Sequence, residues 1–334
     1  MKFANFNTDE RVFIVAEVGN NHEGDFTLAQ EMIGRAAEAG ADAVKFQTFI
    51  ADHYVTKDDS ERFKRLQDFQ FDYAQFQALS QHADDCGILF FSTPFDIGSA
   101  HFLNSLQPIF KVSSGDNNFF PLIDTIAEFN KPTLISTGLV DLSFLDSLHA
   151  RWVGKANRGA LAFLHCVSSY PVVPDEANLK AITTLQARYP DVTVGYSDHT
   201  IGIDAALCAV ALGAQIVEKH FTIDHDYSDF RDHQLSADPA EMRTMVDRIR
   251  VAESLLGHGE KVPQQSEVEL RTAVRRSIGV RRTIAAGEIL TVDDLTWLRP
   301  GTGIPAGRES DVVGKALNRT LQSGEIIYPE MLSA

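Results

Sequence analysis

Residues 12–47, VFIVAEVGNNHEGDFTLAQEMIGRAAEAGADAVKFQ, contain the pattern that decides the fold. Val12–Val18 is a short β-branched run and predicts a strand. Leu28–Ala39 has apolar residues at helical spacing and is followed by Gly40, so it predicts an amphipathic helix. Ala43–Gln47 predicts the next strand. A strand, a helix and a second strand in this order are typical of a parallel βαβ unit.

The same unit recurs as far as residue 256. Further strands are expected at Ile88–Ser92, Ile109–Val112, Thr133–Ser136, Leu161–His165, Val192–Tyr196 and Gln215–Lys219. Helical stretches separate these strands, and a long helix near Pro239–Leu256 ends the series. Eight strand–helix units over about 250 residues predict a closed (β/α)8 TIM barrel, with an open doubly wound sheet as the alternative.

The character of the sequence changes after this helix. Residues 257–276 are polar and contain Gly259 and Pro263, which is typical of a linker with some helix in it. From residue 277 short β-like pieces alternate with glycine-containing turns. We therefore predict a barrel domain over 1–256, a linker over 257–276 and a small, mostly β module over 277–334.

The overall charge limits the class of partner. The chain has 46 acidic and 30 basic residues, a formal net charge of −16, so we expect no binding to nucleic acid or to an anionic membrane. Its first residues lack the features of a signal peptide, and no stretch is apolar enough to span a membrane. Cys86, Cys166 and Cys208 lack metal-type spacing and are expected to be reduced core residues. These features predict a cytoplasmic protein.

Polar residues follow the predicted strands, at the end of a barrel where functional groups belong. Two lysines and four hydroxyl residues stand at these ends, namely Lys45, Thr93, Lys111, Ser114, Ser136 and Ser197. Any one of the serines has a simpler explanation as a helix cap. Six such residues converging on one face instead predict a site for a small phosphorylated anion.

His199 and His220 stand at the ends of neighbouring strands, about 5 Å apart at the backbone. Two imidazoles at that spacing can hold a divalent metal and leave positions open for substrate oxygens. A structural or general-base role is the alternative, and His22 and His165 are competing ligands. Ligand chemistry leaves the ion open between zinc-like metals and manganese or magnesium.

These segments resemble the sialic acid synthase family, the nonulosonate synthases that use phosphoenolpyruvate. The matching stretches are VAEVGNNHEGD (15–25), AVKFQTF (43–49), FFSTPFD (90–96), FKVSSGD (110–116), LISTGL (134–139), LHCVSSYP (164–171), VGYSDHT (194–200) and VEKHFT (217–222). The module at 277–304, SIGVRRTIAAGEILTVDDLTWLRPGTGI, resembles the antifreeze-like (SAF) domain of that family. The resemblance covers almost the whole chain in the right order.

The resemblance implies condensation of phosphoenolpyruvate with an N-acylated amino sugar (N-acetylmannosamine or a bacterial analogue) and water, giving a nonulosonate and phosphate. It implies that the lysines and hydroxyl residues above hold phosphoenolpyruvate, that Glu17 is catalytic, and that His199 and His220 bind the metal. That metal is usually Mn²⁺ in the family, with Mg²⁺ or Co²⁺ as alternatives. The implied sugar-binding residues are Gln47, Asp116, Tyr170, Asp232 and Arg299. The resemblance also implies a homodimer in which the SAF domain brings Arg299 to the partner barrel.

The chain departs from the family on the acceptor side. Asp116 replaces the glutamate of many bacterial members, and residues 226–233, DYSDFRDH, replace a run rich in proline and glycine. Asp232 is the best match to the acceptor-binding aspartate, with Asp229 and Arg231 as alternatives. The sequence does not rank N-acetylmannosamine against di-N-acetylated sugars.

Two other functions are alternatives. The first is a deoxy-ulosonate synthase using a phosphorylated aldose; the SAF-like module and the lack of an obvious second phosphate cluster argue against it. The second is a non-catalytic sugar-binding relative, against which Glu17, His199 and His220 argue.

Overall fold

The computed structural model describes residues 1–155 and 160–333, which form two compact units, Met1–Gly257 and His258–Ala334. The first unit contains one parallel sheet of eight strands: β3 (Phe13–Gly19), β4 (Ala43–Thr48), β5 (Leu89–Pro94), β6 (Phe110–Val112), β7 (Thr133–Ser136), β8 (Leu161–Cys166), β9 (Thr193–Asp198) and β10 (Ile216–His220). The sheet order is β5-β4-β3-β10-β9-β8-β7-β6, and the two end strands, β5 and β6, contact each other. The sheet therefore curls into the expected (β/α)8 barrel, which is confirmed over an open sheet.

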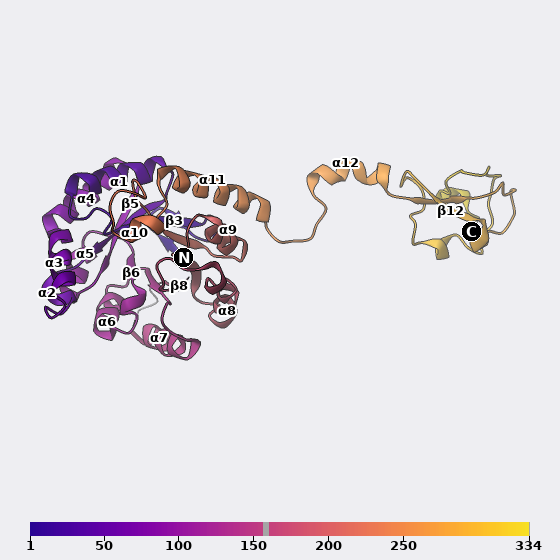
Figure 1. Ribbon diagram of the computed structural model, residues 1–334. Helices are drawn as coiled ribbons and strands as arrows, with labels where there is room; N and C mark the ends of the chain where they lie inside the picture. Colours follow the sequence, from indigo (N-terminus) through magenta and orange to yellow (C-terminus); the bar gives the residue numbers. More distant parts are fainter. Residues whose placement is uncertain (156–159, 334) are drawn as a thin grey trace. The chain divides into compact units, whose positions relative to one another are not determined.

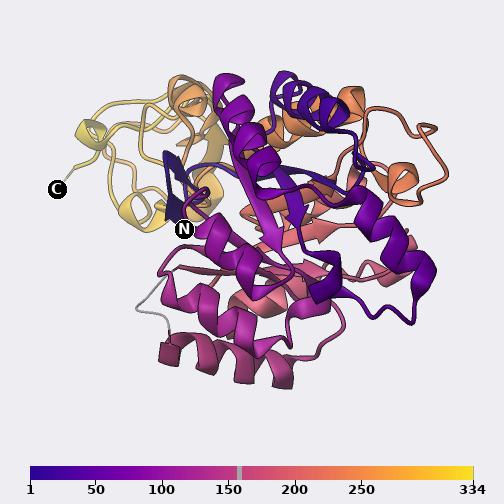
Figure 2. The ribbon, with the colours of Figure 1, turned by 90° about the vertical axis from the view of Figure 1, so that its left-hand side faces the viewer.

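Helices surround the strands in the view of Figure 1, and Figure 2 shows the same unit from the side. They are α1 (Phe26–Glu38), α2 (Ala51–Tyr54), α3 (Ser60–Phe69), α4 (Tyr73–Asp85), α5 (Ile97–Asn104), α6 (Phe120–Glu128), α7 (Leu142–Lys155), α8 (Ala181–Arg188), α9 (Asp204–Ala211), α10 (Asp232–Leu235) and α11 (Pro239–Leu256). Asp72 and Asp238 begin α4 and α11 with capping boxes. None of the described helices has the length and apolar character needed to cross a membrane.

A short hairpin, β1 (Lys2–Phe3) and β2 (Phe6–Asn7), closes the amino end of the barrel. Phe3 and Phe6 each meet the ring of Phe13 edge-on, with centroids 4.8 and 4.9 Å apart. These rings belong to the apolar cluster that fills the barrel interior near the amino ends of the strands, so this end of the barrel is a packed core.

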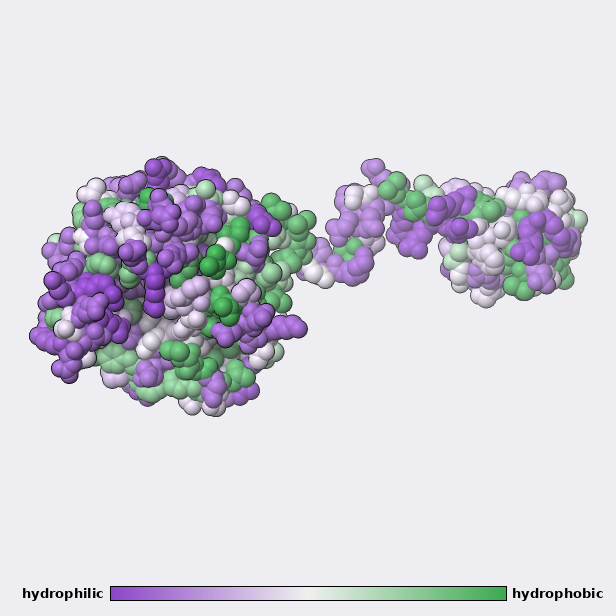
Figure 3. Space-filling view, viewed as in Figure 1, coloured by the Kyte–Doolittle hydropathy of each residue, from purple (hydrophilic) through white to green (hydrophobic). Residues whose placement is uncertain are grey.

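The second unit holds α12 (Gln265–Val274) and an antiparallel pair, β11 (Ser277–Val280) and β12 (Leu295–Leu298). Its small core is built from aliphatic residues, among them Ile278, Val280 and Leu295. Hydrophilic residues predominate over α1 to α4 in Figure 3, whereas hydrophobic ones gather at the outer end of α11.

Candidate active site

The barrel interior changes character along each strand. Successive side chains of a strand alternate between the two faces of the sheet, so residues two apart share a face. Near the amino ends this inner face is apolar and includes Phe13, Val15, Ala43, Phe91, Ile109, Leu134, Leu164 and Ile216. Two residues beyond these apolar positions the same face carries Glu17, Lys45, Thr93, Lys111, Ser136, Cys166 and Glu218. These side chains line a cavity of about 950 Å³.

Most of the residues expected at the site reach this cavity. Twelve line it: Glu17, Lys45, Gln47, Thr93, Lys111, Ser114, Ser136, Tyr170, Ser197, His199, His220 and Asp232. Asp116 is not among the lining residues; its carboxylate accepts a 2.5 Å hydrogen bond from Ser113 Oγ. Arg299 is exposed and belongs to the second unit.

The two lysines depend on two buried carboxylates. Lys45 Nζ lies 2.7 Å from Glu17 Oε2 and 3.6 Å from Glu218 Oε2, and Lys111 Nζ lies 3.6 Å from Glu218 Oε1. All four residues are at most 5% exposed. Burial alone would raise the pKa of Glu218, but Lys111 and Lys45 outweigh it and lower this pKa to about 2. Glu218 is therefore a fixed negative charge between two cations.

The pKa values of Glu17 and Lys45 are both raised. Burial raises the pKa of Glu17 despite the attraction of Lys45, while Glu218 adds to the rise. Burial would lower the pKa of Lys45, but the two carboxylates hold it above its usual value. Glu17 is also positioned by Gln47, whose Nε2 donates to Glu17 Oε1 over 3.2 Å. A carboxyl group with a raised pKa beside a cavity suits proton transfer.

Hydroxyl groups gather around Gly138. Ser114 Oγ accepts a 3.1 Å hydrogen bond from the Gly138 N–H, and a Cβ on Gly138 would come within 2.7 Å of that oxygen. The side-chain oxygens (Oγ) of Ser136 and Ser168 are buried and have no hydrogen-bond partner among the described residues. This cradle of unpaired donors beside two lysines fits an anion.

The imidazoles of His199 and His220 face each other, with ring centroids 5.3 Å apart. His199 Nδ1 lies 2.8 Å from the carbonyl of Val167, so it donates there and leaves Nε2 free to bind. His220 Nδ1 is buried and has no partner among the described residues. Burial and then His199 hold the pKa of His220 well below its usual value, which favours the neutral form that binds metals. Burial would lower the pKa of His199, but Cys166 and the Val167 carbonyl raise it, so this imidazole must give up a proton when it binds a metal. With that proton released, the two buried ring systems fit a divalent cation.

The two competing histidines lie elsewhere. His165 Nε2 is bonded to the carbonyl of Ala177 at 2.8 Å, and the side chain points away from the barrel interior into a second cavity of about 600 Å³. His22 stacks on Phe71 at 4.2 Å, and burial lowers its pKa to about 3. Neither lines the main cavity.

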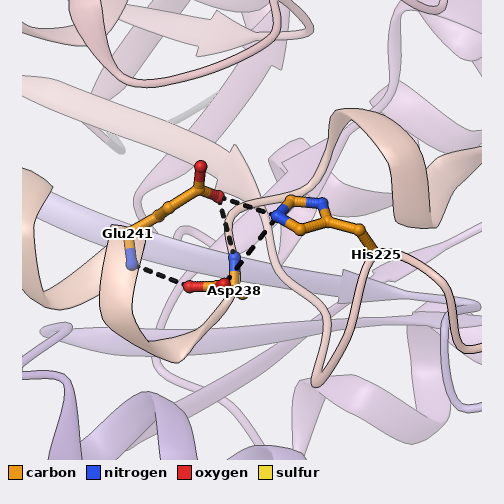
Figure 4. Close-up of side chains that lie close together, drawn as sticks. All are labelled: His225, Asp238 and Glu241. Carbon is orange, nitrogen blue, oxygen red and sulfur yellow. Dashed lines mark hydrogen bonds and ion pairs between the residues drawn. The ribbon is translucent and has the colours of Figure 1, made fainter.

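A different cluster also has donors suited to a cation. His225, Asp238 and Glu241 have potential ligand atoms within 4.8 Å of one another (Figure 4). These groups already bond to each other: His225 Nε2 lies 3.1 Å from Glu241 Oε2, and the two acids form the capping box of α11. Their arrangement is explained by anchoring the loop after β10 to the start of α11.

Strand residues whose side chains point to the outer face of the barrel support the site from outside. Lys219 Nζ lies 3.1 Å from Asp198 Oδ2, and both side chains are completely buried. Asp198 Oδ1 also accepts hydrogen bonds from Tyr196 Oη at 3.1 Å and from the N–H and hydroxyl of Thr200 at 2.8 Å. Because Asp198 precedes His199 and Lys219 precedes His220, this ion pair fixes the spacing of the two imidazoles.

The polar lining residues that were not among the predicted site residues include Arg62, Arg65, Ser168 and Glu218. Glu218 had a usable signal, since it lies two residues before His220 and must share its face. The arginines had no such signal, because they lie in a polar stretch between two predicted strands that folds as α3.

Known protein families match most of this chain. Residues 32–261 match the model of the NeuB family, and residues 275–333 match the SAF domain. The N,N′-diacetyllegionaminic acid synthase of Legionella pneumophila is 40% identical over 96% of this chain and 95% of its own. The human N-acetylneuraminate-9-phosphate synthase is 32% identical over 96% of this chain and 92% of its own. The crystal structure of N-acetylneuraminic acid synthetase from Leptospira borgpetersenii, in complex with citrate, superimposes with a TM-score of 0.75 and is 35% identical in sequence. The superposition covers 80% of this chain and 94% of that structure's chain.

The ion pair outside the barrel makes a stability prediction. Lys219→Met leaves the buried Asp198 carboxylate without its counter-ion and should lower the free energy of unfolding of the barrel by about 3–5 kcal/mol. Adding Asp198→Asn removes the uncompensated charge and should recover part of that loss. Chemical denaturation followed by circular dichroism measures both. A double variant no more stable than the single one would contradict the role given to the charge.

Proposed function

The chain belongs to the NeuB family, which confirms the resemblance identified from the sequence, and we propose that it condenses phosphoenolpyruvate with an N-acylated amino sugar. The products are a nonulosonate and phosphate. The observation that carries the proposal is the single cavity in which buried Lys45 and Lys111, a hydroxyl cradle and a histidine pair converge. The names of the relatives differ in the sugar acid made, so they support the reaction class and leave the acceptor open.

In this mechanism the lysines, with Thr93, Ser114, Ser136 and Ser197, hold the phosphate and carboxylate of phosphoenolpyruvate. Lys45 Nζ already donates to Thr93 Oγ1 at 3.1 Å, and Glu218 accepts from Ser197 at 2.8 Å, so the donors are positioned before substrate arrives. Carbon 3 of phosphoenolpyruvate attacks the aldehyde carbon of the open-chain sugar. Water then adds at carbon 2, and phosphate leaves with cleavage of its C–O bond.

His199 and His220 would hold a divalent metal, which we propose to be Mn²⁺. When bound there, such an ion supplies Lewis-acid polarisation of the sugar aldehyde. Glu17 steers or deprotonates the attacking water or the acceptor, and Gln47 holds Glu17 in place. Gln47, Tyr170 and Asp232 contact the sugar.

We also propose a homodimer in the cytoplasm, in which Arg299 acts on the acceptor in the partner's barrel. Arg299 is exposed, and its guanidinium can donate several hydrogen bonds in a fixed fork. Asp116 remains a proposed sugar contact only if the loop after β6 shifts, since its carboxylate is now bonded to Ser113.

Phosphate release tests the reaction. The full-length protein with Mn²⁺ and phosphoenolpyruvate should release phosphate when N-acetylmannosamine or a di-N-acetylated analogue is added, and not when a simple phosphorylated aldose such as arabinose 5-phosphate is added. Mass spectrometry should detect the nonulosonate. Turnover with the aldose alone would favour a deoxy-ulosonate synthase, and binding of a sugar without turnover would favour a non-catalytic relative.

Metal binding at the histidine pair can be measured apart from activity. His220→Ala should abolish high-affinity Mn²⁺ binding in calorimetry, along with turnover, because one of two protein ligands is lost. His225→Ala is the matched control, since it removes a histidine from the other candidate cluster, and it should bind Mn²⁺ as the parent does. Loss of Mn²⁺ binding in His225→Ala alone would place the ion at the His225, Asp238 and Glu241 cluster and would contradict the proposal.

Arg299→Ala and His220→Ala test action across the dimer. Each variant should be inactive alone. Co-expressed in equal amounts, random pairing should restore about a quarter of the parental activity, because half the dimers contain one complete site out of two. A mixture that stays inactive would contradict action of Arg299 in the partner's barrel.

A further inference from the structure

The loop after β3, residues 20–24, contacts several segments that border the cavity, and the mechanism above gives it no role. Asn20 Nδ2 donates a 2.9 Å hydrogen bond to Gln47 Oε1, the side chain proposed to contact the sugar. At the other end of the loop, a Cβ on Gly24 would come within 2.2 Å of the carbonyl oxygen of Asp68. The loop therefore packs directly on the last turn of α3 and also holds a side chain of β4.

Asn21 ties this loop to both ends of the segment that follows β10. Its side chain is completely buried, and Nδ2 donates to the carbonyl of Phe221 and to Ser236 Oγ, at 2.9 Å in each case. The Ser236 hydroxyl in turn donates to the carbonyl of Asp232 at 2.5 Å. The backbone of Asp232, a proposed sugar contact, is therefore held indirectly from the loop after β3.

Glu23 holds the middle of the same segment. Its Oε1 accepts a 2.9 Å hydrogen bond from His233 Nε2 and another from the Ser228 hydroxyl. The ring of His233 is completely buried, and its Nδ1 lies 2.6 Å from Thr222 Oγ1. Residues 229–232, which lie between the two donors, all line the cavity. One carboxylate oxygen thus fixes both ends of a lining segment.

The backbone of Glu23 indicates that the position of this carboxylate is specified. Glu23 has a φ of 47°, in the left-handed region that residues other than glycine seldom occupy. Such a conformation costs free energy and persists only where the surrounding contacts impose it. Here the Glu23 N–H is bonded to the Asn20 carbonyl at 2.9 Å, and the side chain is fixed by its two donors.

Given the proposed condensation, we propose that Glu23 is a positioning residue for the acceptor, which holds Asp232 at the sugar by acting through His233 and Ser228. Asp232 directly precedes His233, so a shift of the imidazole moves the carboxylate that binds the sugar. Small displacements of a binding group weaken binding and orientation strongly. Glu23 also lines the cavity, and direct contact with the sugar is the alternative that the variants below distinguish.

Steady-state kinetics of Glu23→Ala test the role. The full-length protein is assayed with Mn²⁺, phosphoenolpyruvate and whichever of N-acetylmannosamine or a di-N-acetylated analogue the parental protein turns over faster. We expect KM for the sugar to rise about tenfold or more, because two hydrogen bonds to a charged group are lost, while KM for phosphoenolpyruvate stays within about twofold. Glu23→Gln keeps an acceptor oxygen and should recover most of the loss. A similar rise of both KM values in Glu23→Ala would overturn the proposal.

Glu31→Ala is the matched control. Glu31 is a half-exposed glutamate of the following helix, α1, where it pairs with Arg35 and does not line the cavity. Both KM values should equal those of the parental protein. A rise of KM for the sugar in Glu31→Ala as large as that in Glu23→Ala would overturn the specific role of Glu23.

A double variant separates action through the segment from direct contact. If Glu23 acts through His233, Glu23→Ala with His233→Asn should raise KM for the sugar no more than Glu23→Ala alone. Ser228→Ala in place of His233→Asn gives the same comparison without disturbing the buried ring. Additive increases in both double variants would show that Glu23 contacts the sugar itself and would overturn the proposal.

Hydrogen exchange measures the same contact without turnover. In Glu23→Ala the amides of residues 226–236 should exchange faster than in the parental protein, while those of β10 should not change. Unchanged exchange in residues 226–236 would overturn the proposal. Absence of turnover by the parental protein with every sugar would instead overturn the proposed function, and faster exchange in Glu23→Ala would then show that the contact exists without that function.

Discussion

Two buried ammonium groups set the main constraint on this barrel. Lys45 and Lys111 are each 3% exposed, and a buried cation is strongly destabilising unless carboxylates surround it. Glu218 lies between them, and Glu17 contacts the first. Removing either acid would leave a charge uncompensated, so the four residues form one unit. The arrangement keeps cations and hydrogen-bond donors oriented without substrate, which is what stabilisation of a transferring phosphate requires.

The alternation of side chains along the strands explains how this unit is built and supported. The inner face supplies packing at the amino end and charge at the carboxyl end, while the outer face supplies the Lys219–Asp198 pair that joins β9 to β10. The same two strands therefore carry the reactive imidazoles inside and their support outside. A barrel allows this division because each strand has two buried faces.

The sequence was informative wherever function depends on strands. Their number, order and parallel arrangement followed from periodicity, and twelve of the fourteen expected site residues lie around one cavity because strand ends converge. It was less informative for loops. Nothing local in the sequence shows that Asp116 turns back to Ser113 or that residues 60–69 are helical. The position of Glu218, two residues before His220, indicated that it faces the interior, but its role between the two lysines appears only when both are placed beside it.

This difference between strands and loops bears on how acceptor choice is encoded. The groups assigned to phosphoenolpyruvate and the metal lie mainly on or just after strands whose positions are fixed by ladders on both sides and by buried ion pairs. The outer lining residues of the cavity lie on α3 and on residues 226–233, which meet in the aromatic contact between Phe69 and Phe230. Changing the outer groups leaves every strand ladder paired and every buried charge compensated. A barrel of this kind can therefore change its sugar without rebuilding its chemistry, and the departure of residues 226–233 from the family pattern falls in the part of the site where such change costs least stability.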